Sequence, residues 1–389
     1  VQCPYHRCRL RPRWGRIFKS LSDEKQEDIY EQYQKFLNSI PAGDTVTLNF
    51  INTFEDFEDR LKRVAPAIQG DNLDKYRKEY TDILSEKLRS ARTSIATAKY
   101  FTYSIVSPSV DDAMARFEEI DNDVLSSFEK ICGEKAKPLS LERRLEVMHD
   151  IMNKGDESFF FEHDENGKTT IDWARIRKLG LTTKDIIAPP SFKFSNSNFM
   201  IGERYGQTLF LDSIANWLNT NFLTELTEAS FESCIALRIV PIAPEETSTL
   251  IKRRNIAITN DVIEAQKKAM KNNISPEFIS VDIKNAKMQI DELQDDLLNR
   301  DQKMFIIGLV ITHFADSEAE LKTQKNIIKN IALKYVCGFK SLNMQQERGL
   351  FASMPFGTNR AFENIRRLIK TESLGVFMPF DFAAATQEG

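Results

Sequence analysis

The sequence lacks most features of secreted and membrane-spanning proteins. Its 389 residues include five cysteines, an odd number at wide spacing, which argues against a disulfide framework and indicates a reducing compartment. The longest purely apolar run, FIIGLVI at 305–311, is much shorter than the roughly 18 residues that span a bilayer. Residues 1–18 contain no apolar core of a secretory signal. These absences predict a cytoplasmic protein.

Motifs for nucleotide and nucleophile chemistry are also missing. A phosphate-binding loop needs G-x-x-x-x-G-K-[ST] after a strand. The nearest segment, VCGFKS at 336–341, follows a predicted helix and has Phe339 between Gly338 and Lys340. No G-x-S-x-G elbow marks a serine nucleophile. We therefore expect no catalytic or cofactor-binding residue, and this chain alone is expected to be inactive as an enzyme.

Metal-ligand patterns are equally weak, because the four histidines are scattered. His6 lies between Cys3 and Cys8, but no fourth ligand follows at zinc-finger spacing, so a basic chain end is the favoured interpretation. The segment FEHDENG at 161–167 gathers acids around His163, and a solvated turn is favoured over a cation site. No metal-ligating residue is predicted.

An internal repeat is the most informative feature that is present. The segments ICGEKAKPLSLERRL (131–145) and VCGFKSLNMQQERGL (336–350) share Cys-Gly, Glu-Arg and a final Leu in register. Upstream, KYFTYSIVSPSVDDAMARF (99–117) resembles KMFIIGLVITHFADSEAEL (303–321) with one residue of slippage. The repeat predicts two halves with the same order of elements.

Strand and helix patterns follow that order in each half. The first half predicts a helix at 23–40, a strand at 45–53, a helical excursion whose second arm carries Leu73, Tyr76, Tyr80, Ile83 and Leu84, a strand at 99–107, a helix at 110–131, a short strand at 136–140 and a helix at 141–152. The second half predicts strands at 205–214, 232–243, 303–314 and 338–343, helices at 215–228 and 317–335, an excursion at 244–301 and a last helix.

The pattern of β-α-β, excursion, β-α-β predicts an α+β protein with two ferredoxin-like (split βαβ) units in tandem. Each unit carries a helical excursion between its second and third strands. The arginine-rich N-terminus stands where the first strand should be, so the first unit is expected to lack that strand and to expose a sheet edge. The expected segments are a basic disordered segment at 1–17, a first unit at 18–152, an ordered connector at 153–202, a second unit at 203–355 and a C-terminal strand and tail at 356–389.

The excursion at 244–301 predicts an antiparallel helical hairpin with apolar residues at heptad spacing. Such a seam is more typical of two helices that pack on each other than of a cofactor site, but a projecting hairpin also suits partner docking. The candidate partner surface consists of basic residues on the hairpin and near the C-terminus: Arg253, Arg254, Lys267, Lys268, Arg366 and Arg367.

Five stretches, in this order and spacing, resemble the N-terminal, pre-motor region of the CagE/TrbE/VirB family of conjugation and type IV secretion ATPases. The likeness is to the form found in conjugative elements of Gram-positive bacteria. The stretches are YRKEY (76–80), GLTTKDIIAPPSFKF (180–194), ERYGQTLFL (203–211), LNRDQKMF (298–305) and TESLGVFMPF (371–380).

This resemblance implies a part that docks the motor onto the secretion complex and supports assembly. In that family the strand matching 371–380 leads into a RecA-like motor, whose Walker motif this sequence does not contain. The resemblance therefore implies that ATP and Mg²⁺ belong only to the absent motor domain. It also implies membrane-anchored subunits and a second copy as partners, and a position at the cytoplasmic face of the membrane.

The expected function is thus the non-catalytic docking and assembly part of a type IV secretion ATPase. The alternative is a single-stranded nucleic-acid-binding module of the transfer machinery, because KYFTYSIV at 99–106 interleaves a Lys with aromatic residues as RNA-recognition strands do. The strand lacks the expected glycines, and a net charge of −4 gives no attraction to the transferred DNA.

Overall fold

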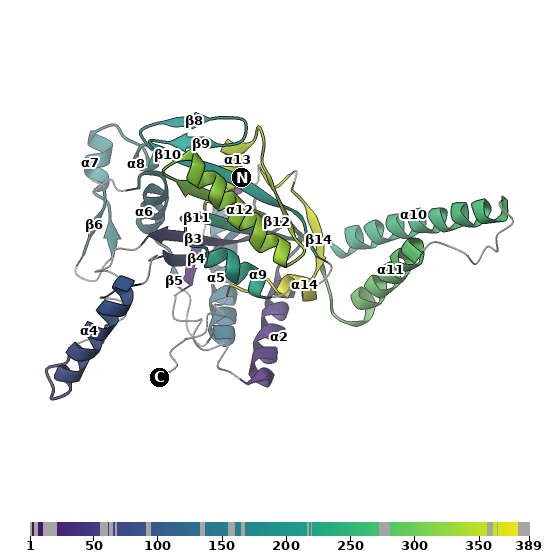
Figure 1. The fold of residues 1–389 in the computed structure, drawn as a ribbon, viewed down its shortest axis with the longest axis horizontal. Coiled ribbons are helices and arrows are strands. Elements are labelled where there is room, and N and C mark those ends of the chain that lie inside the picture. Colours follow the sequence, from purple (N-terminus) through teal and green to yellow (C-terminus); the bar gives the residue numbers. More distant parts are fainter. Residues whose placement is uncertain are drawn as a thin grey trace.

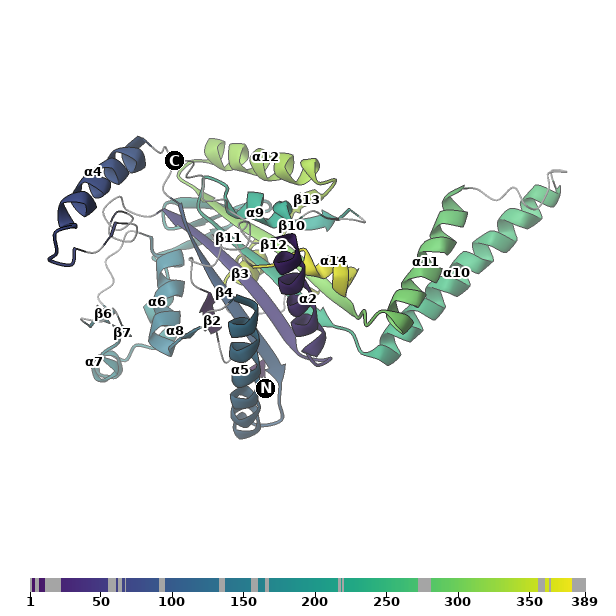
Figure 2. The same ribbon diagram turned by 90° about the horizontal axis from the view of Figure 1, so that it is seen from below.

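The computed structural model describes residues 2–3, 7–10, 22–54, 61, 65–66, 68–90, 95–132, 137–154, 160–164, 168–215, 218, 220–271, 281–355, 361–363 and 365–379. These residues form a mixed α/β protein with one large antiparallel sheet of 12 strands and a separate two-stranded hairpin, β6 (Glu162–His163) with β7 (Thr169–Thr170). Two helical elements project from opposite ends of the body (Figures 1 and 2).

The main sheet runs in the order β5-β2-β4-β3-β11-β12-β10-β9-β8, and β1, β13 and β14 pair with β4, β10 and β12. Its strands are β1 (Gln2–Cys3), β2 (Arg7–Leu10), β3 (Thr45–Phe54), β4 (Ile95–Val106), β5 (Lys137–Pro138), β8 (Phe192–Phe194), β9 (Phe199–Ile201), β10 (Arg204–Ser213), β11 (Ser233–Pro241), β12 (Met304–Ala315), β13 (Gly338–Ser341) and β14 (Arg367–Lys370).

Helices cover both faces of this sheet. The helices of the described residues, including the projecting α4, α10 and α11, are α2 (Asp23–Ser39), α4 (Asp74–Ser90), α5 (Val110–Cys132), α6 (Leu141–Met152), α7 (Trp173–Lys178), α8 (Thr183–Ile187), α9 (Asn221–Thr227), α10 (Pro244–Lys271), α11 (Val281–Asn299), α12 (Glu318–Lys334), α13 (Gln346–Ser353) and α14 (Thr371–Gly375). The main core joins one sheet face to α2, α5, α9, α12 and α14, and a second cluster joins the other face to α6 and α13.

The alternation of side chains along the central strands explains this layering. Successive residues of a strand point to opposite faces. On β11, Ile235 and Leu237 belong to the main core, whereas Cys234 and Ala236 pack on the opposite side. Because both faces are apolar, the central strands read as nearly continuous hydrophobic runs and are buried on both sides.

The two halves of the sheet have the same strand order. Numbered along the chain, β2, β3, β4 and β5 lie in the order fourth, first, third, second, and so do β10, β11, β12 and β13. The second strands, β3 and β11, are antiparallel neighbours and join the halves. The excursions also correspond, because α4 lies between β3 and β4, and α10 and α11 lie between β11 and β12.

The expectation that the first half lacks its first strand is wrong. Residues 7–10 form β2, which pairs antiparallel with β4 on one side and with β5 on the other. RCRL alternates Arg with apolar residues, which is a strand pattern. The many arginines of this segment favoured its interpretation as a basic chain end instead. The expectation of disorder for residues 4–6 and 11–17 falls outside the described residues.

The predicted C-terminal strand is displaced toward the N-terminus. Residues 367–370 form β14, whereas Thr371–Gly375 form the short helix α14. The buried side chains of Leu374, Phe377 and Met378 are three and four residues apart, which is helical spacing and not the alternation of a strand. Phe380 lies outside the described residues.

The remaining strong patterns agree closely with the structure. The predicted helix at 110–131 is α5, whose start is capped by the Ser109 hydroxyl accepting from the amide of Asp112 at 3.1 Å. The predicted helical hairpin at 244–301 is α10 and α11. The helix predicted at 215–228 is described only from Asn221, as α9.

The imidazole of His313 lies fully inside the core. His313 on β12 is completely buried, its Nδ1 lies 2.9 Å from Oε1 of Gln324, and its Nε2 has no hydrogen-bond partner. Burial lowers the pKa of His313 to about 4, since the charged imidazolium cannot be solvated there.

This burial predicts acid-sensitive folding. As pH falls from about 6.5 to about 4, the unfolded chain binds a proton at His313 that the folded chain does not, so stability decreases. Denaturant titrations across this window should show wild type losing up to about 3 kcal/mol more than His313→Gln. Parallel stability curves for the two proteins would contradict the assignment.

Candidate docking surfaces

The acidic cluster near His163 has a structural role. Glu146 on α6 is buried and contacts Thr169 Oγ1 at 2.5 Å, Arg143 Nη1 at 2.5 Å and His163 Nε2 at 2.7 Å. Burial alone would raise the pKa of Glu146, but hydrogen bonds from Thr169 and Arg143 outweigh it and lower the pKa. These contacts fasten the β6–β7 hairpin to α6. No group of three or more metal-ligating side chains is found among the described residues.

The helical hairpin formed by α10 and α11 is held together by its apolar seam. The seam residues that the heptad spacing predicts are all at least half-buried: Ile251, Ile258, Val262, Ala265, Ala269, Ile283, Ala286, Ile290, Leu293 and Leu297. Lys287 Nζ donates to Asn255 Oδ1 across the two helices at 2.9 Å. The hairpin extends well away from the sheet (Figure 2).

An ion pair fixes the base of the hairpin to the sheet. Asp296 on α11 is only 3% exposed, and its carboxylate contacts Lys370 Nζ on β14 at 2.7 Å and Arg300 Nη1 at 3.2 Å. Burial alone would lower the pKa of Lys370, but hydrogen bonds to Asp296 and Glu372 outweigh it and raise the pKa. Because the Asp296 carboxylate is buried, removing its basic partner would leave a buried charge uncompensated.

A cavity of about 640 Å³ lies next to this ion pair, between the hairpin and the body. We call it the hairpin-base cavity. Its lining is mostly apolar and includes Leu250, Ile251, Ile290, Leu293, Met304 and Leu368. Arg253 and Arg254 are the charged lining residues that the hairpin contributes. An apolar hollow of this size with a few charged groups is typical of a binding site.

The structure divides the six predicted partner residues among different places. Arg253 and Arg254 line the hairpin-base cavity, whereas Lys267 and Lys268 lie about 20 Å farther along α10. Arg367 donates through Nε to the carbonyl oxygen of Asp212 at 2.7 Å, so its guanidinium joins β14 to the end of β10. Arg366 lies close to Arg238, whose pKa is lowered to about 10 by burial first and by Arg366 second.

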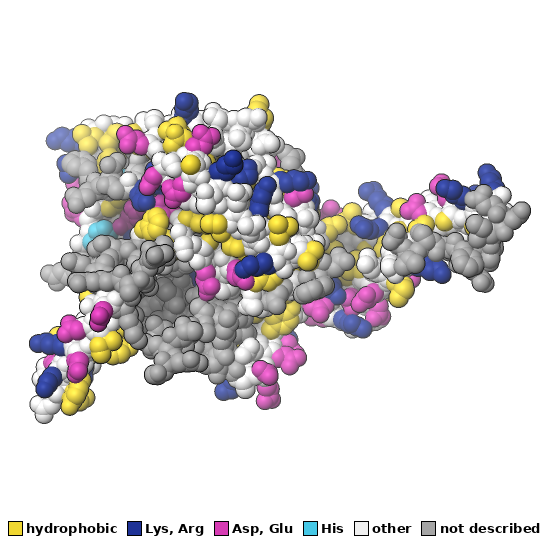
Figure 3. Space-filling model, in the orientation of Figure 1, with side chains coloured by type: hydrophobic (Ala, Val, Ile, Leu, Met, Phe, Trp, Pro, Cys, Tyr) yellow, Lys and Arg dark blue, Asp and Glu magenta, His cyan; other side chains and the backbone are white. Residues whose placement is uncertain are grey.

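Sequence reasoning missed a second apolar line on α10. Ile256, Ile263 and Met270 follow each other at intervals of seven and are 41% to 62% exposed. Helical geometry places Lys267 on the same side, and we call these four residues the outer face of α10. Figure 3 shows basic side chains along the hairpin. In the sequence these residues form a second heptad series next to the seam, and the interpretation of the hairpin included only the seam series.

A further exposed apolar surface lies on α4, at the other end of the molecule. Leu73, Tyr76, Tyr80 and Ile83 are 44% to 65% exposed, and we call them the α4 face. Leu84, on the neighbouring side of the helix, is buried. The residues that sequence analysis placed along one arm are therefore mainly directed to solvent.

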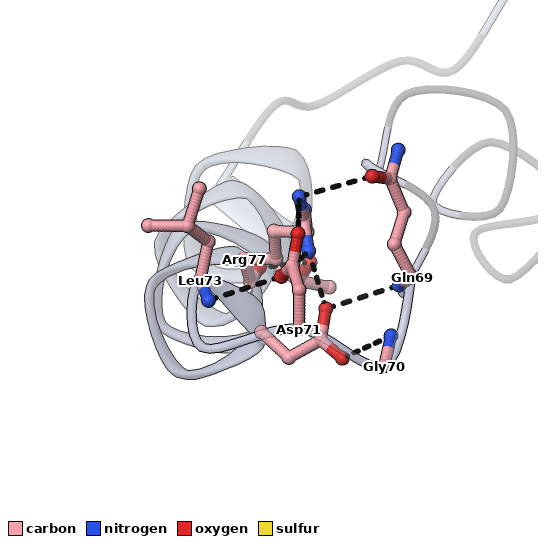
Figure 4. Close-up of polar contacts among 7 residues, drawn as sticks. Gln69, Gly70, Asp71, Leu73 and Arg77 are labelled. Carbon is pink, nitrogen blue, oxygen red and sulfur yellow. Dashed lines mark hydrogen bonds and ion pairs between the residues drawn. The ribbon is translucent and has the colours of Figure 1, made fainter.

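The start of α4 is held by a cluster of polar contacts (Figure 4). The Asp74 carboxylate accepts from the amides of Gly70 at 2.7 Å and Gln69 at 3.1 Å. Arg77 binds both Asp71 and Asp74, and these contacts lower the pKa of Asp71 and raise that of Arg77. Gly70, with φ of +78°, turns the chain into this cluster. α4 thus begins from a defined turn.

The aromatic residues that suggested nucleic-acid binding are inaccessible. Tyr100, Phe101 and Tyr103 on β4 are buried. The Phe101 ring packs on Phe36 and Phe128, with centroids 5.7 and 5.2 Å apart. Bases cannot stack on these rings, so the strand pattern reflects core packing.

Comparison with known proteins gives no further assignment. No family model and no curated protein matches the chain. In the described part, no helix has both the length and the hydropathy required to traverse a bilayer.

The Asp296–Lys370 pair leads to a prediction about the hairpin base. Asp296→Asn should lower the free energy of unfolding by about 1–3 kcal/mol, because it leaves Lys370 without its buried carboxylate partner. Asp295→Asn, one residue earlier and half exposed, should change it by less than about 0.5 kcal/mol. Urea unfolding of both variants measures the difference, and equal losses would contradict a structural role for the pair.

Proposed function

We propose that this chain is the non-catalytic docking and assembly part of a conjugation ATPase of the CagE/TrbE/VirB type. The observation that carries the proposal is one continuous sheet with an exposed, projecting helical element at each end. Such elements present surfaces to partners. The sequence resemblance supplies the identity of the machinery.

The strand order supports the finer description of the fold as two ferredoxin-like units in tandem. Each half has four antiparallel strands in the order fourth, first, third, second, which is the order of a split βαβ unit. Each half also inserts its helical excursion between the second and third strands. We propose that the halves are two copies of one unit, joined through their second strands.

The segment that came nearest to a phosphate loop is part of the sheet. Residues 338–341 form β13 and pair with β10, so their amides belong to the sheet. Lys340 makes an ion pair with Asp212 at 2.7 Å. Neither the backbone nor the lysine is placed to hold a phosphate.

The first test concerns nucleotide. Purified chain should neither hydrolyse ATP nor gain thermal stability from saturating Mg-ATP, because a ligand stabilises only a folded state that binds it. The measurements are phosphate release and the melting temperature with and without Mg-ATP. A shift of several degrees would overturn the non-catalytic assignment.

Docking is assigned to the outer face of α10. Ile263 and Met270 offer apolar contact, and Lys267 and Lys268 are exposed and have no ion-pair partner among the described residues. This combination suits membrane-anchored subunits of the secretion complex that present apolar and acidic side chains. The chain would then lie in the cytoplasm, peripheral to the membrane.

The second test uses charge reversal of Lys267, which lies on this face, and of its exposed neighbour Lys268. In cells that carry the transfer machinery, Lys267→Glu with Lys268→Glu should reduce co-purification with the membrane-anchored subunits at least about tenfold. Lys322→Glu with Lys329→Glu makes the same charge change on the exposed side of α12 and should leave co-purification unchanged. An equal loss from both pairs would point to net charge and refute the assigned face.

The nucleic-acid alternative has weaker support. Its strand is buried, and the net charge of −4 opposes binding to phosphate. The docking proposal accounts for both projecting elements, which the alternative leaves unexplained.

A further inference from the structure

Two exposed apolar surfaces lie at opposite ends of one chain. The α4 face is a convex surface on a projecting helix, and the hairpin-base cavity is a hollow beside the other projection. Figures 1 and 2 show α4 and the hairpin at opposite ends of the body. Neither surface can reach the other within one molecule.

We propose that α4 of one copy docks into the hairpin-base cavity of a second copy, giving head-to-tail self-association. The inference deepens the proposed function, of which assembly is a part, and it rests on that proposal only for its biological purpose. The physical argument needs only the two surfaces.

Shape and polarity match between the two surfaces. The cavity, of about 640 Å³, is open to solvent and lined largely by Ile, Leu and Met side chains. Tyr76 and Ile83 project from α4 seven residues apart, so they lie on one side of the helix about 10 Å from each other. Inserting an aromatic and a branched aliphatic side chain into an apolar pocket is how interfaces place their anchors.

Charges match as well. Glu79 and Glu86 each follow an anchor by three residues, so both carboxylates lie along one edge of the α4 face. Arg253 and Arg254 line the cavity, and no described residue forms an ion pair with either. Two acids contact Lys370 beside the cavity: Asp296, which is bound by Lys370 and Arg300, and Glu372, which lies 2.8 Å from Lys370 Nζ. The cavity therefore favours an occupant with an apolar surface and an acidic edge, which α4 provides.

The symmetry of this contact differs from that of an ordinary dimer. Each copy contributes its α4 face to one contact and its hairpin-base cavity to another, so the contact is heterologous. Copies would therefore build a ring or an open chain. Every interior copy then has both surfaces covered. This property supplies a test that separates the proposal from a two-fold dimer.

The test compares two variants by sedimentation velocity over a range of concentrations. The α4 variant carries Tyr76→Glu and Ile83→Glu, and the cavity variant carries Arg253→Glu and Arg254→Glu. All four side chains are exposed, so folding should persist, as circular dichroism will verify. Wild type should form species heavier than one chain, and each variant alone should weaken this association at least about tenfold.

Mixing the variants gives the decisive result. The α4 variant retains an intact cavity and the cavity variant retains an intact α4 face, so together they should form a one-to-one dimer and nothing larger. A single chain that combines Arg253→Glu and Arg254→Glu with Glu79→Arg and Glu86→Arg should regain the heavier species. The Lys322→Glu, Lys329→Glu protein is the charge-matched control and should behave as wild type.

Three outcomes would overturn the proposal: wild type that stays at the mass of one chain, variants with the wild-type distribution, or a mixture that forms no dimer. The second outcome would leave the cavity to a small amphiphile or an unrelated partner helix. Co-purification with membrane subunits is assigned to Lys267 and Lys268, so failure here leaves the proposed docking function standing.

Discussion

The pairing of β3 with β11 is the interaction on which the rest of the structure depends. Seven residue pairs, from Ser233 opposite Asn52 to Ile239 opposite Val46, join two similar halves into one sheet. Apolar clusters cover both faces of this seam, so its polar groups need partners within the protein. Asn52 meets this need by donating to the carbonyl oxygen of Thr227 at 2.8 Å. The two projecting elements are thus anchored on one continuous body.

Elements with long periodic patterns were predictable because local sequence decides them. The three-four spacing of α5 and the continuous apolar run of β12 needed no knowledge of the rest of the chain. The short β2 was not predictable in the same way. Its four residues become a strand because β4 and β5 lie on either side, and such long-range pairing leaves little trace in a segment rich in arginine.

The candidate surfaces could likewise be predicted only in part. Charge on the hairpin could be recognised in the sequence, but its use could not, because Arg367 is taken by Asp212, which is 155 residues away. The hairpin-base cavity exists only because β14 passes beside α11, so Arg253 and Lys370, far apart in the sequence, line one cavity. The apolar line on α4 was visible beforehand, whereas its exposure followed only from the position of the helix beyond the sheet.

The antiparallel register of the seam has a mechanical consequence. The chain leaves β3 toward α4 near Asn52, and leaves β11 toward the hairpin near Ile239, at the opposite end of the seam. Tension applied between the two projections would therefore pull β3 and β11 past each other along their length. In that geometry the hydrogen bonds of the seam carry the load together and do not open one by one. The register of the seam therefore sets the direction in which the sheet resists a pull between the two projections.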